Sequence, residues 1–287
     1  MHSRESLSRD LAALGLARGD TVMVHASVRS VGPVAGGPDQ IHLAITDAVG
    51  ADGTLLMYAS CPEHYDEVGR DIHAPEIEAE LLEKLPPFDA RTARSARDNG
   101  ALVELLRTYP GSQVNHHVAR FVAWGRHAGH LFAEQPWDYA LGAGSVLERF
   151  VALDGKILLL GSDHDTVTFL HYAEHVGDFP DKRVARYRVP VLEDGARVWR
   201  WMEEIDTSDG GAHVHWPERF FARIVDGHLR ATGNRGGRVG DARCHLIGAR
   251  ALHEDALAIM ARVAVDAAWA ERLVEGTDPT FRTTGRR

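Results

Sequence analysis

The stretch Leu158-Leu-Leu-Gly-Ser-Asp-His-Asp-Thr-Val-Thr-Phe-Leu-His-Tyr-Ala-Glu174 contains the strand-to-helix transition that decides the fold. Its apolar run ends at Gly161, as a buried strand does before a turn, and helix-forming residues resume five positions later. Thr168, His171 and Glu174 are three positions apart, so they share one face of the predicted helix. A histidine beside carboxylates at the carboxyl end of a strand is a candidate for proton transfer, because small environmental changes shift its charge near neutral pH.

The rest of the chain alternates predicted helices and strands. An amphipathic helix is expected at 3–16, a strand at 20–24, a loop at 27–37, a helix at 41–49 and a strand at 54–59. Further helices are expected at 76–84, 101–106, 216–225 and 252–262, and strands at 121–124, 184–192 and 197–201. Asp194-Gly195, between the last two strands, predicts a hairpin turn. This order of elements indicates an α/β layered fold.

Length and composition indicate a folded protein without a membrane-spanning segment. The chain has 287 residues, 44% of them hydrophobic, which is enough to bury a core as one large domain or two small ones. No apolar run approaches the roughly 20 residues that span a bilayer. The first residues lack the apolar core of a secretory signal, so we expect a cytoplasmic protein that does not enter a membrane.

Charge and cysteine content exclude further classes. A formal net charge of −9 argues against nucleic acid as a partner, since such surfaces need clustered Lys and Arg. The same acidic balance suits a polycationic small molecule. Cys61 and Cys244 lack the spacing of a metal finger or a redox pair, so both are expected to be free thiols.

The 158–174 stretch resembles the signature segment of the aminoglycoside 3-N-acetyltransferases, which runs Leu-Leu-Leu-Gly-x-x-x-Asp-x-x-Thr-x-Leu-His-x-Ala-Glu. Asp165, Thr168, His171 and Glu174 occupy its polar positions. Other segments match the family in the expected order between residues 5 and 265: 24–32, 36–37, 53–57, 121–125, 155–161, 204–210 and 239–242. The chain departs from the family at 113–120, where Gln-Val-Asn-His-His-Val-Ala-Arg replaces the usual Arg-Ser-x-His-Pro-x-x-Ser. It is therefore identified as a divergent member.

The resemblance implies a fold and an activity. The fold is a single α/β domain over residues 1–270, with a mixed central β-sheet flanked by helices, as in antibiotic N-acetyltransferases; residues 271–287 are expected to be a flexible tail. The activity is transfer of an acetyl group from acetyl-CoA to the 3-amino group of a 2-deoxystreptamine aminoglycoside, which inactivates the antibiotic. Acetyl-CoA is the implied co-substrate, with no metal, and the enzyme is expected to act as a monomer or a homodimer.

The catalytic roles follow from the same resemblance. His171 is the expected general base, since an ammonium group cannot attack a thioester until it has lost a proton. The resemblance assigns Glu204 as the carboxylate that orients His171, while helical spacing makes Glu174 the geometrically available alternative. Thr168, or a backbone amide near Ser27, is expected to stabilise the oxyanion.

Binding residues are expected in two groups. The loop after the first strand can cradle phosphates with its backbone N–H groups, and Arg29 can pair with a phosphate. The expected cofactor contacts are Ser27, Val28, Arg29, Ser30, Val31, Gly36, Gly37 and His116. Carboxylates and an aromatic ring can bind the amino groups of a sugar. The expected substrate contacts are Glu63, Tyr65, Asp138, Asp163, Glu174, Asp206 and Asp209.

Three alternatives remain open at the level of sequence. A related acyl-CoA-dependent N-acyltransferase would act on a non-antibiotic amine, and a binding protein would sequester the drug without consuming acetyl-CoA. A metal-dependent hydrolase would assemble ligands from Asp163, His164, Asp165, His171 and the His213-x-His215 pair. The hydrolase is disfavoured because no recognised zinc-binding spacing is present.

Overall fold

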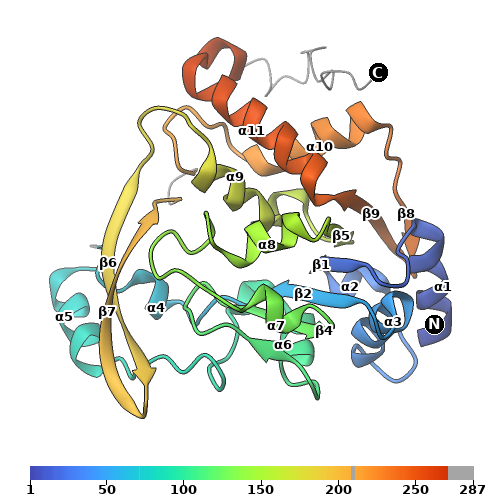
Figure 1. The fold of residues 1–287 in the computed structure, drawn as a ribbon, viewed down its shortest axis with the longest axis horizontal. Coiled ribbons are helices and arrows are strands. Elements are labelled where there is room, and N and C mark those ends of the chain that lie inside the picture. Colours follow the sequence, from blue (N-terminus) through green and yellow to red (C-terminus); the bar gives the residue numbers. More distant parts are fainter. Residues whose placement is uncertain (71, 208–210, 271–287) are drawn as a thin grey trace.

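A mixed seven-stranded sheet forms the centre of the computed structural model, which describes residues 1–70, 72–207 and 211–270 (Figure 1). Its strand order is β3-β4-β2-β1-β5-β9-β8. The strands are β1 (Thr21–Ala26), β2 (Thr54–Tyr58), β3 (Gln113–Val114), β4 (Phe121–Gly125), β5 (Lys156–Leu160), β8 (Gly237–Val239) and β9 (Ala242–Gly248). β1 pairs in parallel with β2 and β5, and the remaining pairs are antiparallel. The predicted fold class is therefore confirmed.

Helices cover both faces of this sheet, because its central strands present apolar side chains to both sides. Leu158 and Leu160 of β5 belong to one buried cluster and Ile157 and Leu159 to the other, as the two-residue period of a strand requires. The first cluster is completed by α1 (Arg4–Leu14), α3 (Asp39–Val49) and α6 (Ala101–Arg107). The second is completed by α7 (Ala128–Leu131), α8 (Val146–Ala152), α9 (His171–Val176), α10 (Phe220–Thr232) and α11 (Ala249–Val265).

A long hairpin lies at one end of the molecule, beside two shorter helices (Figure 1). It consists of β6 (Val184–Glu193) and β7 (Ala196–Ile205), and its neighbours are α4 (His64–Glu67) and α5 (Pro75–Lys84). Asp194 and Gly195 have φ angles of 48° and 78°, which confirms the predicted tight turn with two left-handed positions. A separate apolar cluster that includes Tyr65, Phe88 and Tyr187 packs under the hairpin.

Some elements differ from the sequence-based expectation. The segment after β5 forms two short 3₁₀ turns, η2 (His164–Thr166) and η3 (Thr168–Leu170), before α9 begins. Asp163 provides the cap there, accepting a hydrogen bond from the backbone N–H of Asp165 at 2.8 Å. α10 begins at residue 220 rather than 216, and α8, β8 and β9 were not predicted. The remaining short elements are α2 (Val28–Val31) and η1 (Arg97–Asn99).

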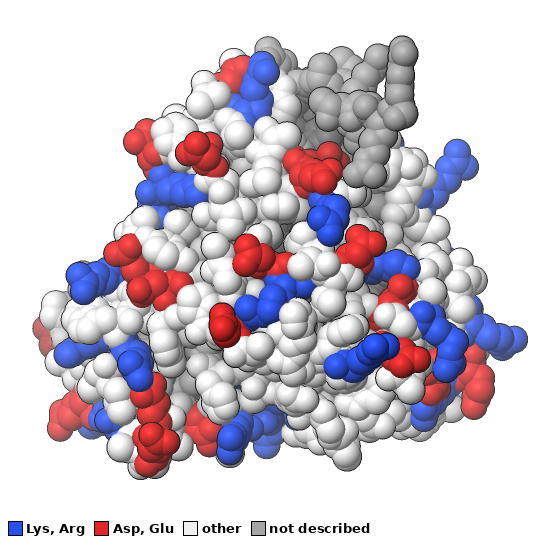
Figure 2. All heavy atoms as spheres, in the orientation of Figure 1, with Lys and Arg blue, Asp and Glu red and all other residues white. Residues whose placement is uncertain are grey.

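The cysteines and the lengths of the helices bear on the predicted thiols and on the predicted lack of a membrane span. Cys61 and Cys244 are both buried and free, as expected. None of the helices in the described ranges is long and apolar enough to cross a membrane. Acidic and basic side chains are interspersed over the face of the molecule in Figure 2.

Candidate active site

The carboxyl end of β5 lies against the loop that follows β1. The backbone N–H of Ser27 donates to the carbonyl oxygen of Leu160 at 2.9 Å, and the hydroxyl of Ser30 donates to that of Gly161 at 3.2 Å. Gly161 has a φ of 64°, and a Cβ atom there would lie 2.6 Å from Cβ of Ser30. Glycine is therefore needed at this position both for the backbone angle and for the close approach of the loop.

His171 opens α9 and is paired with Glu174. Nδ1 of the ring is hydrogen-bonded to the Glu174 carboxylate, whose side chain is only 1% exposed. An ionised carboxylate only accepts hydrogen bonds, so in the neutral ring Nδ1 carries the hydrogen and Nε2 carries the lone pair. Burial lowers the pKa of His171, but the charge and the hydrogen bond of Glu174 outweigh it, so the pKa lies above its usual value. The ring has the form that a general base needs.

Among the described residues, Glu204 hydrogen-bonds His175, and the ring of His171 hydrogen-bonds Glu174 rather than the Glu204 that the resemblance implied. Oε1 of Glu204 lies 2.5 Å from Nε2 of His175, and Oε2 accepts a hydrogen bond from the backbone N–H of Ala140 at 2.9 Å. The spacing of residues along α9 explains these partners. Glu174 is three positions after His171 and lies beside its ring, and His175 is one turn beyond His171 and lies beside Glu204. The charge of Glu204 still contributes to the raised pKa of His171.

His171 lines two adjoining cavities. One, of about 230 Å³, holds polar and charged side chains from several elements. They include Tyr58, Ser60, Asp66, Arg70, Thr168, His175, Tyr187, Glu204 and Thr207. The other, of about 220 Å³, is bounded by Asp165, Glu174, Arg219 and the rings of Trp216, Phe220 and Phe221. The predicted catalytic residues Thr168 and His171 are thus brought to one cavity, together with Glu204.

A further cavity borders the predicted cofactor loop. It has a volume of about 880 Å³, and Ser30 and Gly161 form part of its wall. Three arginines (Arg230, Arg235 and Arg243) and two aspartates (Asp226 and Asp241) also line it, which leaves a small excess of positive charge. Arg29 and Gly36 of the loop are exposed, whereas Val31 is fully buried, so the side chain of Val31 cannot contact a cofactor. The loop therefore combines exposed polar groups with a neighbouring basic cavity.

Several side chains that were predicted to bind the substrate contact other residues of the protein instead. Tyr65 is buried in the cluster under the hairpin, with its ring centroid 5.2 Å from that of Phe88, and it is not among the residues that line the two cavities beside His171. Asp163 accepts a hydrogen bond from Arg219 at 2.7 Å, and Asp138 accepts one from the backbone N–H of Glu203 at 2.8 Å.

The remaining acidic predictions lie in three different settings. Glu63 is exposed at the start of α4. Asp206 precedes Thr207, which lines both cavities. Asp209 falls outside the described residues. Asp66, which belongs to the same acidic stretch as Glu63, and Arg70, which was not predicted, line the cavity instead. The short helix that buries Tyr65 presents its neighbour Asp66 to another side.

The divergent segment 113–120 ends in an arginine that bonds several backbone carbonyl groups. Arg120 is fully buried and donates to the carbonyl oxygens of Ser60, Ala90, Ala93 and Arg94 at 2.7–3.1 Å. Burial lowers its pKa to about 10. Arg120 thereby fastens the segment 90–94 to the end of β2.

His116 and its neighbour lie beside a further cavity. His116 is exposed and lines a cavity of about 570 Å³ that Ser27–Gly37 does not border, so the structure does not bring it together with the other predicted cofactor residues. His117 lines the same cavity; its Nδ1 accepts from the backbone N–H of Ala119 at 2.9 Å. This bond leaves Nε2 to donate to the carbonyl oxygen of Trp137 at 3.3 Å.

The ligand set of the hydrolase alternative is not assembled in the described residues. His164 pairs with Asp226 at 2.7 Å and Asp163 with Arg219, while His171 is held by Glu174. His213 and His215 face each other with ring centroids 5.1 Å apart. These side chains therefore serve local contacts rather than one metal centre.

Comparison with known proteins gives one consistent result. A sequence profile of the family described as aminoglycoside 3-N-acetyltransferase matches residues 23–261. The chain is 40% identical over 252 residues to aminoglycoside N(3)-acetyltransferase III of Pseudomonas aeruginosa, covering 88% of this chain and 90% of that protein. It is 39% identical over 264 residues to aminoglycoside N(3)-acetyltransferase VII of Streptomyces paromomycinus, covering 86% and 88%.

Solved structures agree with this result. A structure described as AAC-IIIb binary with CoASH superposes with a TM-score of 0.83 at 42% identity, over 90% of this chain and 96% of that one. A structure described as AAC-VIa bound to Sisomicin superposes with a TM-score of 0.83 at 34% identity, over 92% and 99%.

Proposed function

The chain belongs to the aminoglycoside 3-N-acetyltransferase family, and we propose that it transfers the acetyl group of acetyl-CoA to the 3-amino group of a 2-deoxystreptamine aminoglycoside. The product is the acetylated and inactivated antibiotic. The observation that carries the proposal is the His171–Glu174 pair at the meeting of two cavities, within the stretch that matches the family signature. We place the reaction in the cytoplasm, where acetyl-CoA is available.

His171 acts on the attacking nitrogen. The ammonium group of the acceptor first loses one proton to give a free amine. Nε2 of neutral His171 then takes a second proton as the nitrogen attacks the thioester carbonyl and the C–N bond forms. Glu174 stabilises the imidazolium that results. Cleavage of the C–S bond releases the thiolate of coenzyme A, which takes up a proton and leaves as the thiol.

Thr168 stabilises the oxyanion that forms in this step. It lies three residues before His171 and lines the same cavity. A hydroxyl donor aimed at the carbonyl oxygen stabilises developing charge more strongly in a cavity than in water.

The cavity shared by His171, Asp66 and Glu204 receives the amine. Its two carboxylates match the ammonium groups of an aminoglycoside, and the formal net charge of −9 favours the approach of a polycation. Arg70 on the same wall donates to Asp66 at 3.2 Å and so holds this carboxylate in place.

The cofactor lies along the loop after β1, in contact with Ser27, Arg29, Ser30, Gly36 and Gly37. Its phosphates extend toward the basic cavity beside Ser30, where arginine side chains can make charge-assisted hydrogen bonds to them. The thioester then reaches His171 past the end of β5.

Thiol release from acetyl-CoA tests the proposal, measured with a thiol-reactive dye across a panel of aminoglycosides and with mass analysis of the products. We expect release only when a 2-deoxystreptamine drug is present, with one acetyl group added to the 3-nitrogen. Release that requires a non-antibiotic amine instead would show a related N-acyltransferase. Drug binding without thiol release would show a sequestering protein.

A further inference from the structure

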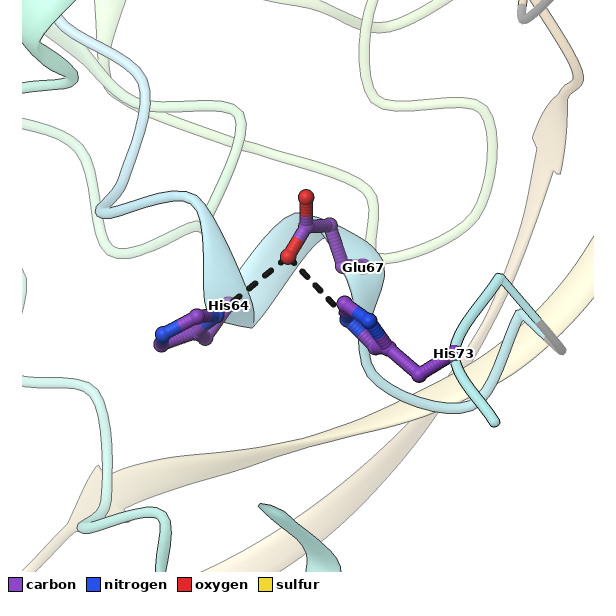
Figure 3. Close-up of side chains that lie close together, drawn as sticks. All are labelled: His64, Glu67 and His73. Carbon is purple, nitrogen blue, oxygen red and sulfur yellow. Dashed lines mark hydrogen bonds and ion pairs between the residues drawn. The ribbon is translucent and has the colours of Figure 1, made fainter. Parts of the chain in front are cut away.

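Three side chains converge on one point beside α4 (Figure 3). His64 and Glu67 lie on the same helical turn, and His73 comes from the segment before α5. Oε2 of Glu67 lies 3.3 Å from Nδ1 of His64 and 3.1 Å from Nε2 of His73. We propose that this cluster binds one divalent transition-metal ion, with zinc preferred.

The distances fit a tetrahedral metal centre. Zinc binds imidazole nitrogen and carboxylate oxygen at roughly 2.0–2.2 Å, which places neighbouring ligand atoms of a tetrahedron roughly 3.3–3.5 Å apart. Both contacts of Glu67 are within a few tenths of an ångström of that separation. The three ligand atoms all lie within 4.8 Å of one another. Only a small movement of His64, whose side chain is 60% exposed, is needed to bring the two nitrogens to one ion.

The ligand types select the metal. Two imidazoles and one carboxylate favour zinc and its transition-metal neighbours over Mg²⁺ and Ca²⁺, which take oxygen ligands. Three protein ligands leave a fourth position for water. Glu67 and His73 are mostly buried, with side chains 23% and 20% exposed, so the site is held on one side by packed structure.

The site would stiffen a wall of the active-site cavity. α4 also carries Asp66, and Arg70 follows it; both line the cavity that contains His171. A metal ion held between α4 and His73 clamps this wall from its far end. The effect on acetyl transfer rests on the proposed function, whereas metal binding itself does not.

Zinc binding to the full chain, freed of any affinity tag and dialysed against a chelator, tests the proposal. Calorimetric titration with Zn²⁺ should show one tight site per chain. His64→Ala and His73→Ala should each weaken this site by more than about tenfold, since each removes a ligand. His130→Ala is the matched control, because His130 is exposed and lies outside the cluster, and it should bind zinc like the parent chain.

Two further readouts make the outcome decisive. Co²⁺ in place of zinc should give the visible bands of a four-coordinate ion, and these bands should be absent in His73→Ala. Zinc should raise the melting temperature of the parent chain and of His130→Ala, but not that of His73→Ala. Absence of a tight site, or equal affinity in all three variants, would overturn the proposal and leave a hydrogen-bonded cluster only. Because no acetyl-CoA or drug is present, that result would not bear on acetylation.

Discussion

His175 bridges Glu204 and the backbone of the candidate base. Nδ1 of His175 lies 2.6 Å from the backbone carbonyl oxygen of His171, and Nε2 lies 2.5 Å from Oε1 of Glu204. A carbonyl oxygen only accepts hydrogen bonds, so Nδ1 donates to it. Glu204 is therefore linked through His175 to the backbone of the residue that supplies the base.

Replacing His171 by alanine should reduce kcat/KM by about 10²–10⁴-fold, because the variant lacks the imidazole that takes the proton from the amine. Coenzyme A affinity and the melting temperature should change little, since the side chain is partly exposed and does not line the basic cavity beside Ser30. Steady-state kinetics and calorimetric titration with coenzyme A measure the two effects. Near-normal acetylation by this variant would show that His171 is not the general base.

Glu174→Gln should cost more activity than Glu204→Gln, because the ring of His171 hydrogen-bonds Glu174, whereas Glu204 hydrogen-bonds His175. The pH profile should change as well. The raised pKa of His171 means that kcat/KM rises with pH through that pKa as the imidazole becomes neutral. Loss of the negative charge in Glu174→Gln lowers this pKa, so the acid limb should move to lower pH. A larger loss in Glu204→Gln, or an unmoved limb in Glu174→Gln, would contradict this assignment.

Gly161→Ala should raise the KM for acetyl-CoA and lower stability, because the new Cβ would lie 2.6 Å from Cβ of Ser30. Gly195→Ala is a matched control, since Gly195 has a φ of 78° but a methyl group there would point into open space, with no neighbouring side chain within 4 Å. Both variants carry the cost of a left-handed backbone, and only the first displaces the loop. Equal KM values for acetyl-CoA in the two variants would show that the loop after β1 does not contribute to cofactor binding.

Acid should destabilise the fold through His25 and His117. Burial lowers the pKa of each to about 4, from a usual value of 6.5. The unfolded chain therefore binds more protons below pH 6.5, and the free energy of unfolding should fall as pH drops from about 6.5 to 4, by roughly 3 kcal/mol per histidine. Urea unfolding at a series of pH values measures the slope. The slope reports how many more protons the unfolded chain binds than the folded one. His25→Leu should lower this difference by up to one proton, and an unchanged slope would show that His25 does not contribute.

Arg120→Ala should lower the free energy of unfolding by roughly 3 kcal/mol or more, because it leaves four carbonyl oxygens without their donor. Arg200→Ala is the comparison. Arg200 is 43% exposed and pairs with Glu193 at the surface, so its loss should lower the free energy of unfolding much less. Chemical denaturation of both variants gives the two values, and similar losses would mean that the carbonyl contacts of Arg120 contribute little.

Local sequence patterns predicted the parts of the molecule that depend on local physics. The hairpin turn at Asp194-Gly195 follows from the backbone preference of two residues. The Glu174 contact also follows from spacing along the helix, although the resemblance directed attention to Glu204 instead. β9 was missed because exposed Arg243 and buried, polar His245 interrupt its apolar residues, so the strand has neither an apolar run nor a strict alternation.

Contacts between distant segments could not be predicted in the same way. His175 and Glu204 are 29 positions apart and meet only because β7 is packed beside α9. The four carbonyl partners of Arg120 come from segments 26 to 60 positions away. Pairing at such separations depends on the assembled fold, which composition and periodicity do not specify.

Arg120 makes a serine hard to accommodate at this position, although serine is the residue of the pattern from which the segment 113–120 departs. The single hydroxyl of a serine could donate to only one of the four carbonyl groups that the guanidinium serves. Arg120→Ser would leave the other three without this donor and an emptied space behind them. The segment 90–94 would therefore have to be rebuilt before a serine could replace this arginine.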